Sequence, residues 1–134
     1  MNHDAEHLRL LAIFHYVVAG IAALVSLIPV IHLVIGLAMI LSPHVFEGSG
    51  SPPPAFIGWI FVIIAGGFIL LGLTMAAFIL TAGRFLAASK HYTFCLVMAG
   101  VECLFMPFGT VLGVFTIVVL TRDSVKLLFN HPTA

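Results

Sequence analysis

Residues 10–41 read LLAIFHYVVAGIAALVSLIPVIHLVIGLAMIL and contain no Asp, Glu, Lys or Arg. A helix needs about 20 mostly apolar residues to cross the roughly 30 Å hydrocarbon core of a bilayer. This apolar stretch is longer than one crossing requires and too short for two. We therefore expect one long membrane helix over residues 8–42, with a bend at Pro29, because proline cannot donate a backbone hydrogen bond.

The composition of the whole chain lies outside the range of soluble domains. Its 134 residues are 62% hydrophobic and 7% charged, whereas about 25% of the residues in a soluble domain are charged. The formal net charge is zero, so the sequence has neither the basic surface of a nucleic-acid-binding protein nor a polybasic patch for anionic lipid. The composition indicates an integral membrane protein that contacts the lipid bilayer and binds no nucleic acid.

The rest of the chain divides into a loop and further apolar segments. Residues 42–54 read SPHVFEGSGSPPP, and their Pro, Gly and Ser content predicts an extramembrane loop over 43–54. A second membrane helix is expected over residues 55–80. The sequence that follows fits either one crossing with long ends or two helices, 86–106 and 108–129, joined by a turn at Pro107.

The positions of the basic residues favour the two-helix alternative. The chain has five Lys and Arg residues, which are Arg9, Arg84, Lys90, Arg122 and Lys126. Cytoplasmic ends and short loops of membrane proteins carry an excess of such residues. Four crossings place all five on one side of the membrane, opposite Glu47, whereas three crossings do not. The sequence therefore predicts an all-α integral membrane fold. It is a single domain over residues 1–134, with four transmembrane helices in an up-down bundle and both termini cytoplasmic.

Small residues at helical spacing indicate where these helices pack. Lipid is as apolar as leucine, so membrane helices associate through close contacts between small residues and through a few polar contacts. Gly72 and Ala76 share one face of the second predicted helix, and Gly109 and Gly113 form a G-x-x-x-G motif on the fourth. We expect these faces to serve contacts within the chain, with contacts between copies as the alternative.

Glu102 is the most costly residue to place inside a bilayer. An ionisable group in a membrane segment usually faces the interior of the bundle and has a partner there. The topology puts His32 in the same half of the membrane as Glu102. A His32–Glu102 pair would relay protons or line a solute path, or would be a structural hydrogen bond that fixes the register of the helices.

The helical face of Glu102 also carries His91, Cys95 and Met98. His91 and Cys95 lie one turn apart and are possible ligands for copper or zinc, with His15 of the first helix as a third. His15 and His91 also suggest a bis-histidine haem site. In the alternative interpretation, Cys95 and Met98 are core residues and His91 lies at the membrane interface. Two ligands on one helix do not make a site, so no cofactor is predicted.

Two stretches resemble small bacterial four-helix membrane proteins for which no activity is known. One is the segment PFGTVLG, residues 107–113, with the apolar helix that follows it, and the other is the opening from His7 to Tyr16. The resemblance implies four helices and a location in the bacterial cytoplasmic (inner) membrane. It implies no activity.

No catalytic fingerprint appears in the sequence, and three classes of function remain. The first is a non-enzymatic accessory or interaction subunit of a membrane complex, which binds other membrane proteins or itself. The second is an oligomeric channel or transporter with a polar path through His32 and Glu102. The third is a haem- or metal-binding electron carrier. The many small-residue faces favour the first.

Overall fold

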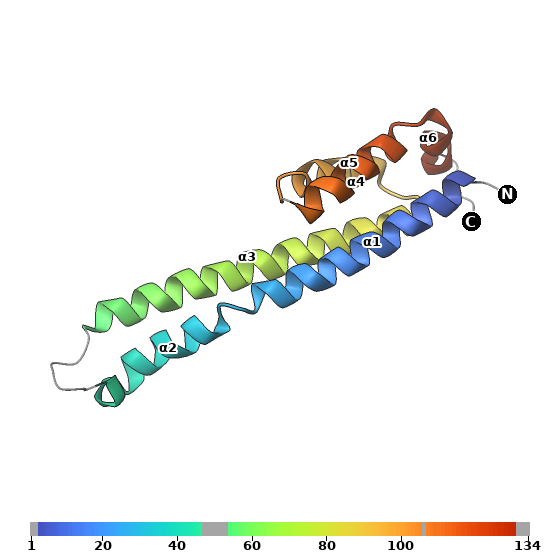
Figure 1. The fold of residues 1–134 in the computed structure, drawn as a ribbon. Coiled ribbons are helices and arrows are strands. Elements are labelled where there is room, and N and C mark those ends of the chain that lie inside the picture. The colour runs from blue at the N-terminus through green and yellow to red at the C-terminus, as the bar shows by residue number, and fades with distance from the viewer. Residues whose placement is uncertain (1–2, 47–53, 106, 131–134) are drawn as a thin grey trace. The chain divides into compact units, whose positions relative to one another are not determined.

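The computed structural model describes residues 3–46, 54–105 and 107–130, and every regular element in these ranges is a helix. The elements in chain order are α1 (His3–Ser26), α2 (Val30–Leu41), the short 3-10 helix η1 (Pro43–Phe46), α3 (Ala55–Ala87), α4 (Tyr92–Glu102), α5 (Phe108–Leu120) and α6 (Asp123–Asn130) (Figure 1). The all-α class predicted from the sequence is confirmed. Glu47 and most of the predicted loop 43–54 lie outside the described residues.

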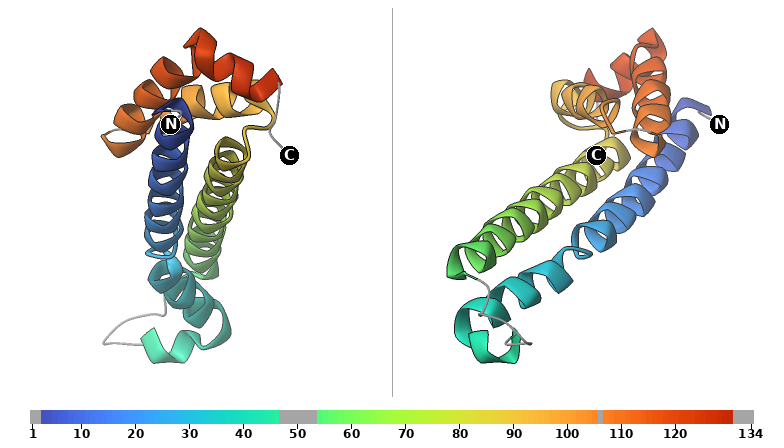
Figure 2. Two further views of the ribbon diagram at one scale, coloured as in Figure 1. Left: turned by 90° about the vertical axis from the view of Figure 1, so that its right-hand side faces the viewer. Right: turned by 60° about the vertical axis from the view of Figure 1, so that its left-hand side comes forward.

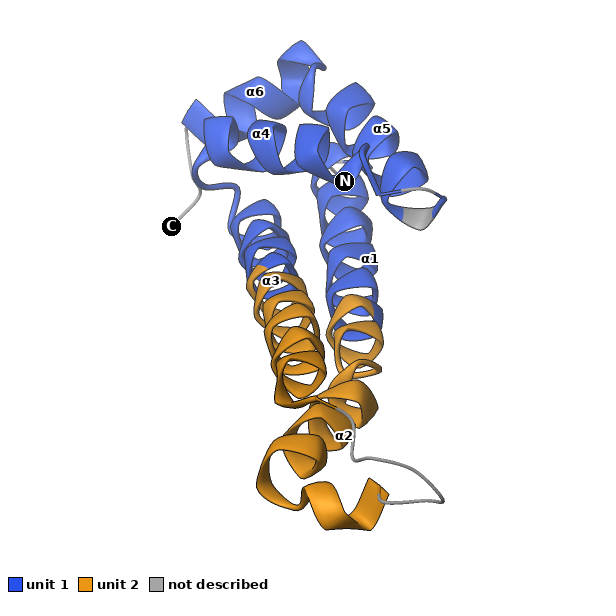
Figure 3. Cartoon of the chain, turned by 90° about the vertical axis from the view of Figure 1, so that its left-hand side faces the viewer, with its two compact units in different colours: residues 1–21, 75–134 blue, residues 22–74 orange. Residues whose placement is uncertain are grey.

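The chain divides into two compact units. Unit 1 comprises residues 1–21 and 75–134, and unit 2 comprises residues 22–74 (Figure 3). Helices α1 and α3 each contribute residues to both units. The single domain expected over residues 1–134 stays a prediction.

The first apolar stretch forms two helices where the sequence suggests one. Helix α1 ends at Ser26, and α2 begins at Val30 directly after Pro29. Residues 27–29 form tight turns between them. The interruption occurs at the proline, which lacks the N–H group that an uninterrupted helix would use.

Helix α3 extends beyond its predicted end, and the next helix starts later than expected. Helix α3 continues to Ala87, with Arg84 in its last turn, where a cation interacts favourably with the carbonyl end of the helix dipole. The chain then turns sharply into α4 (Figure 2). Ser89 and His91 have positive φ angles of 49° and 52°, and this left-handed backbone interrupts a helix. The helix expected over 86–106 is therefore shortened to α4.

The helix expected over 108–129 is also divided, into α5 and α6. Asp123 stands in the first turn of α6, where an acidic group complements the helix dipole. Its Oδ1 atom accepts a hydrogen bond from Lys126 Nζ at 3.0 Å. The tail therefore forms a short helix of its own after a turn at residues 121–122.

Two stretches are long and apolar enough to cross a membrane, judged by length and composition. They are His3–Leu41, which comprises α1 and α2, and Ala55–Ala87, which is α3. Helices α4 and α5 have 11 and 13 residues. At about 1.5 Å per residue they are about 16 Å and about 20 Å long, less than the roughly 30 Å of a hydrocarbon core. The four-crossing topology therefore stays a prediction.

In unit 2, small residues bring α3 close to its neighbours. A Cβ atom added to Gly36 of α2 would lie 2.8 Å from the carbonyl oxygen of Gly58 of α3, and one added to Gly58 would lie 2.9 Å from that of Gly36. A Cβ atom on Gly72 would meet Cβ of Ser26 at the end of α1. Only glycine permits these approaches, which is the packing typical of membrane helices.

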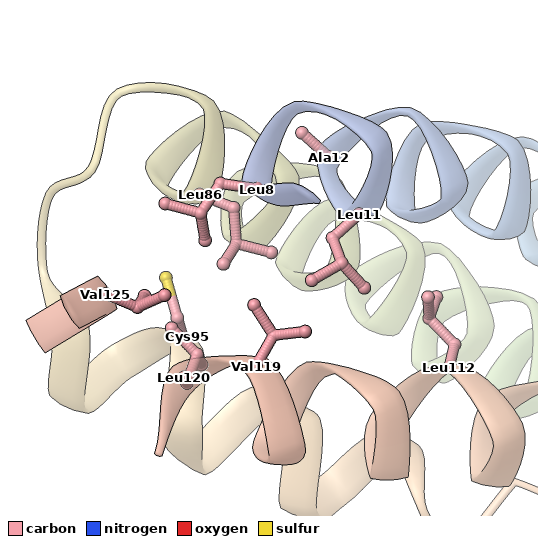
Figure 4. Close-up of a cluster of buried hydrophobic side chains, with 9 residues drawn as sticks. All are labelled: Leu8, Leu11, Ala12, Leu86, Cys95, Leu112, Val119, Leu120 and Val125. Atoms are coloured by element: carbon pink, nitrogen blue, oxygen red, sulfur yellow. The ribbon is translucent and has the colours of Figure 1, made fainter. Parts of the chain in front are cut away.

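Unit 1 contains the main buried core. It is built from Leu8, Leu11 and Ala12 of α1, Leu86 of α3, Cys95 of α4, Leu112, Val119 and Leu120 of α5, and Val125 of α6 (Figure 4). A second buried cluster joins α1, α3 and α4 through Ala19, Ile79, Ala82 and Met98. The Tyr92 hydroxyl donates a hydrogen bond to the Leu120 carbonyl at 3.0 Å and ties the start of α4 to the end of α5.

The G-x-x-x-G motif of α5 lies against the C-terminal end of α4. A Cβ atom on Gly113 would lie 2.6 Å from Cys103 Sγ, and one on Gly109 would meet the carbonyl oxygen of Glu102. The two glycines therefore let α5 approach α4 closely within the chain. Ala76 of α3 is also buried in unit 1.

We predict that Gly113→Ala destabilises the fold by about 1–3 kcal/mol, because the added methyl group needs space that α4 occupies. Gly100→Ala is the matched control, since a Cβ atom at Gly100 has no neighbour within 4 Å and alanine favours helix. Unfolding of the purified protein in detergent, followed by helical circular dichroism, measures both. Equal losses of stability in the two variants would contradict a close α4–α5 contact at Gly113.

Candidate functional site

Unit 1 contains a buried pair of ionisable side chains, one from α1 and one from α4. Nε2 of His15 lies 3.2 Å from Oε2 of Glu102, and the exposed fractions of the two side chains are 0% and 1%. Charged residue types are almost never fully buried unless they are paired. The other ion pairs within the described ranges are more exposed, and they are Asp4 with Arg122 and Asp123 with Lys126.

The helices aim both side chains into the interior of unit 1. His15 lies one turn from Leu11 and one turn from Ala19 along α1, and both of these residues are buried. Gly83 of α3 lies against it, because a Cβ atom there would be 2.9 Å from His15 Cβ. Glu102 is the last residue of α4. The buried residues of α4 are Cys95, Met98, Ala99 and Glu102.

The hydrogen bond of His15 Nδ1 determines which ring nitrogen faces Glu102. His15 Nδ1 lies 2.8 Å from the carbonyl oxygen of Leu11. That oxygen can only accept, so Nδ1 carries a proton, and a neutral His15 presents a lone pair at Nε2. A lone pair facing an ionised carboxylate across 3.2 Å is repelled. A hydrogen bond between the two side chains therefore requires a proton on Nε2 or on Glu102.

The pair is close but incompletely hydrogen-bonded. His15 Nε2 and both carboxyl oxygens of Glu102 have no hydrogen-bond partner of good geometry among the described residues. Glu102 also stands at the C-terminal end of α4, where the helix dipole disfavours a negative charge. The site combines burial, two ionisable side chains and unused hydrogen-bonding capacity.

The imidazole at this site comes from His15, whereas the sequence suggested His32. His32 lies on α2 in unit 2 and is exposed. Its ring stacks on Phe61, with centroids 6.1 Å apart and an interplanar angle of 10°. The expected His32–Glu102 pairing rested on the predicted topology, which puts both residues in the same half of the membrane, whereas the side chain that faces Glu102 is that of His15.

The candidate metal ligands have separate surroundings. His91 is exposed at the N-terminal end of α4, and its ring centroid lies 4.5 Å from that of Phe85. Cys95 is buried, with its Sγ atom 3.9 Å from the carbonyl oxygen of Ala82. His15 faces Glu102. Within the described parts of the chain, no three His, Cys, Asp or Glu side chains are grouped to hold a metal ion.

Comparison with known proteins adds no family to this description. No family model, no curated protein and no solved structure matches the chain. The interpretation of the site rests on the chemistry of its own residues.

The sequence interpretation misses the His15–Glu102 pairing, although a signal for it exists. Ala19 and Ser26 follow His15 at spacings that keep them on one helical face. This is the small-residue face by which α1 packs against other helices. A histidine on a packing face points into the protein, and that placement favours His15 over His32 as the partner of an acidic residue.

We predict that His15→Leu destabilises the protein by about 3 kcal/mol or more, because Glu102 would stay buried without its partner. The double variant His15→Leu/Glu102→Leu removes both polar groups and should recover most of that loss. Unfolding measurements on the two single variants and the double variant form a double-mutant cycle. Losses that simply add would show that the two side chains are not coupled.

Proposed function

We propose that the protein is an integral membrane protein in which α1–α2 and α3 cross the bilayer. The observation that carries this proposal is the apolar surface of these helices. Leu24, Ile31, Phe68 and Leu70 are each between 66% and 71% exposed, and many other large apolar side chains on the same helices are also exposed. A soluble monomer rarely exposes a contiguous apolar patch larger than a few hundred Å². A bilayer covers such a surface.

The basic residues support an orientation for the helices. We place Arg9, Arg84, Lys90 and both termini on the cytoplasmic face, as the excess of Lys and Arg in cytoplasmic segments favours. The α4–α5 hairpin then enters the membrane from that face. Its turn includes Leu104, which is 80% exposed, and the four-crossing topology puts this turn on the non-cytoplasmic side. We propose that the hairpin supplies the third and fourth crossings.

We predict that reporter domains fused after Glu47 and after Ala134 report opposite sides of the membrane, because α1–α2 and α3 carry the chain across and back. In a background without Cys95 and Cys103, Leu104→Cys should react with a membrane-impermeant thiol reagent added from the non-cytoplasmic side. Two fusions on the same side would reject the orientation. Failure of Leu104→Cys to react would show that the hairpin turns back inside the bilayer.

We infer that the protein acts as a non-enzymatic accessory or interaction subunit, bound to another membrane protein or to a second copy. Open glycine positions on the apolar helices support this function. A Cβ atom on Gly20 of α1, or on Gly66 or Gly67 of α3, would have no neighbour within 4 Å. Glycines on membrane helices let another helix approach closely. Gly20 and Gly67 are exposed, Gly66 is half-buried, and none of the three serves such a contact within the described chain.

The channel or transporter function stays the alternative, with a changed site. A proton path in this protein would pass through His15 and Glu102, because these side chains face each other. The pair adjoins a buried apolar cluster that includes Ala19 and Met98. This arrangement favours a structural pair that fixes how α1 and α4 meet, and thus favours the accessory subunit.

We predict that Gly67→Leu reduces the recovery of the partner when the protein is purified from its native membrane, because the larger side chain blocks close approach of another helix. The fold should be unchanged, since nothing in the described chain lies near an added Cβ atom at Gly67. Leu70→Phe, at a position that is 70% exposed, is the control for added bulk. If the two variants and the parent protein recovered equal amounts of the co-purifying proteins, Gly67 would not be a contact with the partner.

A further inference from the structure

A large groove lies in unit 1 between α1 and α5, and the buried His15–Glu102 pair is not part of its lining. Its volume is about 710 Å³, within the range of about 300–1,000 Å³ that ligand sites occupy. All of its lining residues are apolar except His7 and Arg122. Phe14 of α1 and Phe115 of α5 line it while 57% and 62% exposed, so the groove is open to the surroundings.

The two polar lining residues lie at the same end of the groove. Arg122 Nη1 lies 3.9 Å from Asp4 Oδ1, so the end of α5 stands beside the start of α1. Figure 4 also shows that α1 and α5 run antiparallel: Leu120 lies toward the Leu8 end of α1, and Leu112 lies toward its later turns. The groove is therefore basic at one end and apolar along the rest.

The length of the groove matches one leaflet of a bilayer. The lining residues of α1 extend from His7 to Val18, a helical rise of about 16 Å at 1.5 Å per residue. Half of a bilayer's hydrocarbon core is about 15 Å. With Arg122 at the membrane interface, as the proposed orientation has it, the apolar part of the groove reaches the middle of the membrane.

We propose that this groove binds one phospholipid molecule, with its phosphate group at Arg122 and an acyl chain along Phe14 and Phe115. The inference rests on the proposed membrane location. A guanidinium group matches a phosphate group with parallel hydrogen bonds, and His7 adds a second donor at the same end. A hydrophobic helix from a partner would fill the apolar part but would leave the basic end unused.

Asp4 does not prevent this role of Arg122. The two charged groups are 3.9 Å apart, and their side chains are 50% and 27% exposed. An exposed ion pair at this distance is weak, and the guanidinium group has five N–H donors. Most of these donors remain for a phosphate oxygen.

The recognition of the phosphate group is tested with the full chain in detergent micelles. Native mass spectrometry measures the binding of phosphatidylglycerol and of diacylglycerol with the same acyl chains, which lacks the phosphate. We expect phosphatidylglycerol to bind about tenfold more tightly or better, the gain of one charge-assisted contact. Arg122→Gln should remove this difference. Lys126→Gln, which removes a cation on α6 that does not line the groove, should leave it unchanged.

The position of the acyl chain is tested by filling the groove. Val111 lines the groove and is 59% exposed, whereas Val118 of the same helix is 51% exposed and does not line it. Val111→Trp should abolish retention of phosphatidylglycerol, and Val118→Trp should preserve it. Unchanged circular dichroism of both variants shows that their folds are intact.

Each other outcome overturns the inference. Equal effects of Arg122→Gln and Lys126→Gln would show a general attraction of charge, and full binding by Val111→Trp would place the lipid elsewhere. If a protein that co-purifies with the parent chain displaced the lipid, the occupant of the groove would be a helix of that protein. If the protein is absent from alkali-washed membranes, both the membrane location and the lipid site are rejected. If the protein is present in those membranes but binds phosphatidylglycerol no better than diacylglycerol, only the lipid site is rejected.

Discussion

The structure depends on the scarcity of hydrogen-bond partners for polar groups in an apolar protein. In lipid every backbone N–H and C=O must be paired within the protein, and the α-helix meets this condition within one segment. The side chains follow the same rule. The hydroxyl groups of Thr74, Thr81 and Thr116 each donate to the carbonyl one turn earlier at 2.7 Å, and His15 Nδ1 does the same with Leu11. Glu102 has no such local partner.

This exception explains how α1 and α4 meet. A carboxyl group can accept from a helix's own backbone only near its N-terminal end, where N–H groups are free, and Glu102 stands at the opposite end of α4. It therefore needs a proton donor from another helix, and His15 is placed to share one. Because each residue turns a helix by about 100°, a shift of one residue in either helix would separate the pair. The contact is thus compatible with only one of the registers that the small residues around it permit.

The sequence predicts the helical class and a packing role for Gly72, Gly109 and Gly113, because both follow from local composition and spacing, but it does not single out Gly36 or Gly83. It does not predict where the later helices end. The left-handed backbone at Ser89 and His91 is adopted by residue types that usually avoid it, and no glycine marks the turn. This turn connects α3 to α4, the helix that carries Glu102. Helix periodicity places His15 on a packing face, but only the tertiary structure joins it to Glu102.

The same basic residue has two separable roles in these proposals. Arg122 contributes to the orientation of the chain and forms the basic end of the α1–α5 groove. Orientation depends on positive charge near a helix end, which lysine supplies equally. Recognition of a phosphate group depends on the planar guanidinium fork, which lysine lacks. Since Arg122 lies just beyond α5 and half of its side chain is exposed, neither role requires the buried core to rearrange. An orientation signal can therefore also serve as a lipid contact without a stability cost to the bundle.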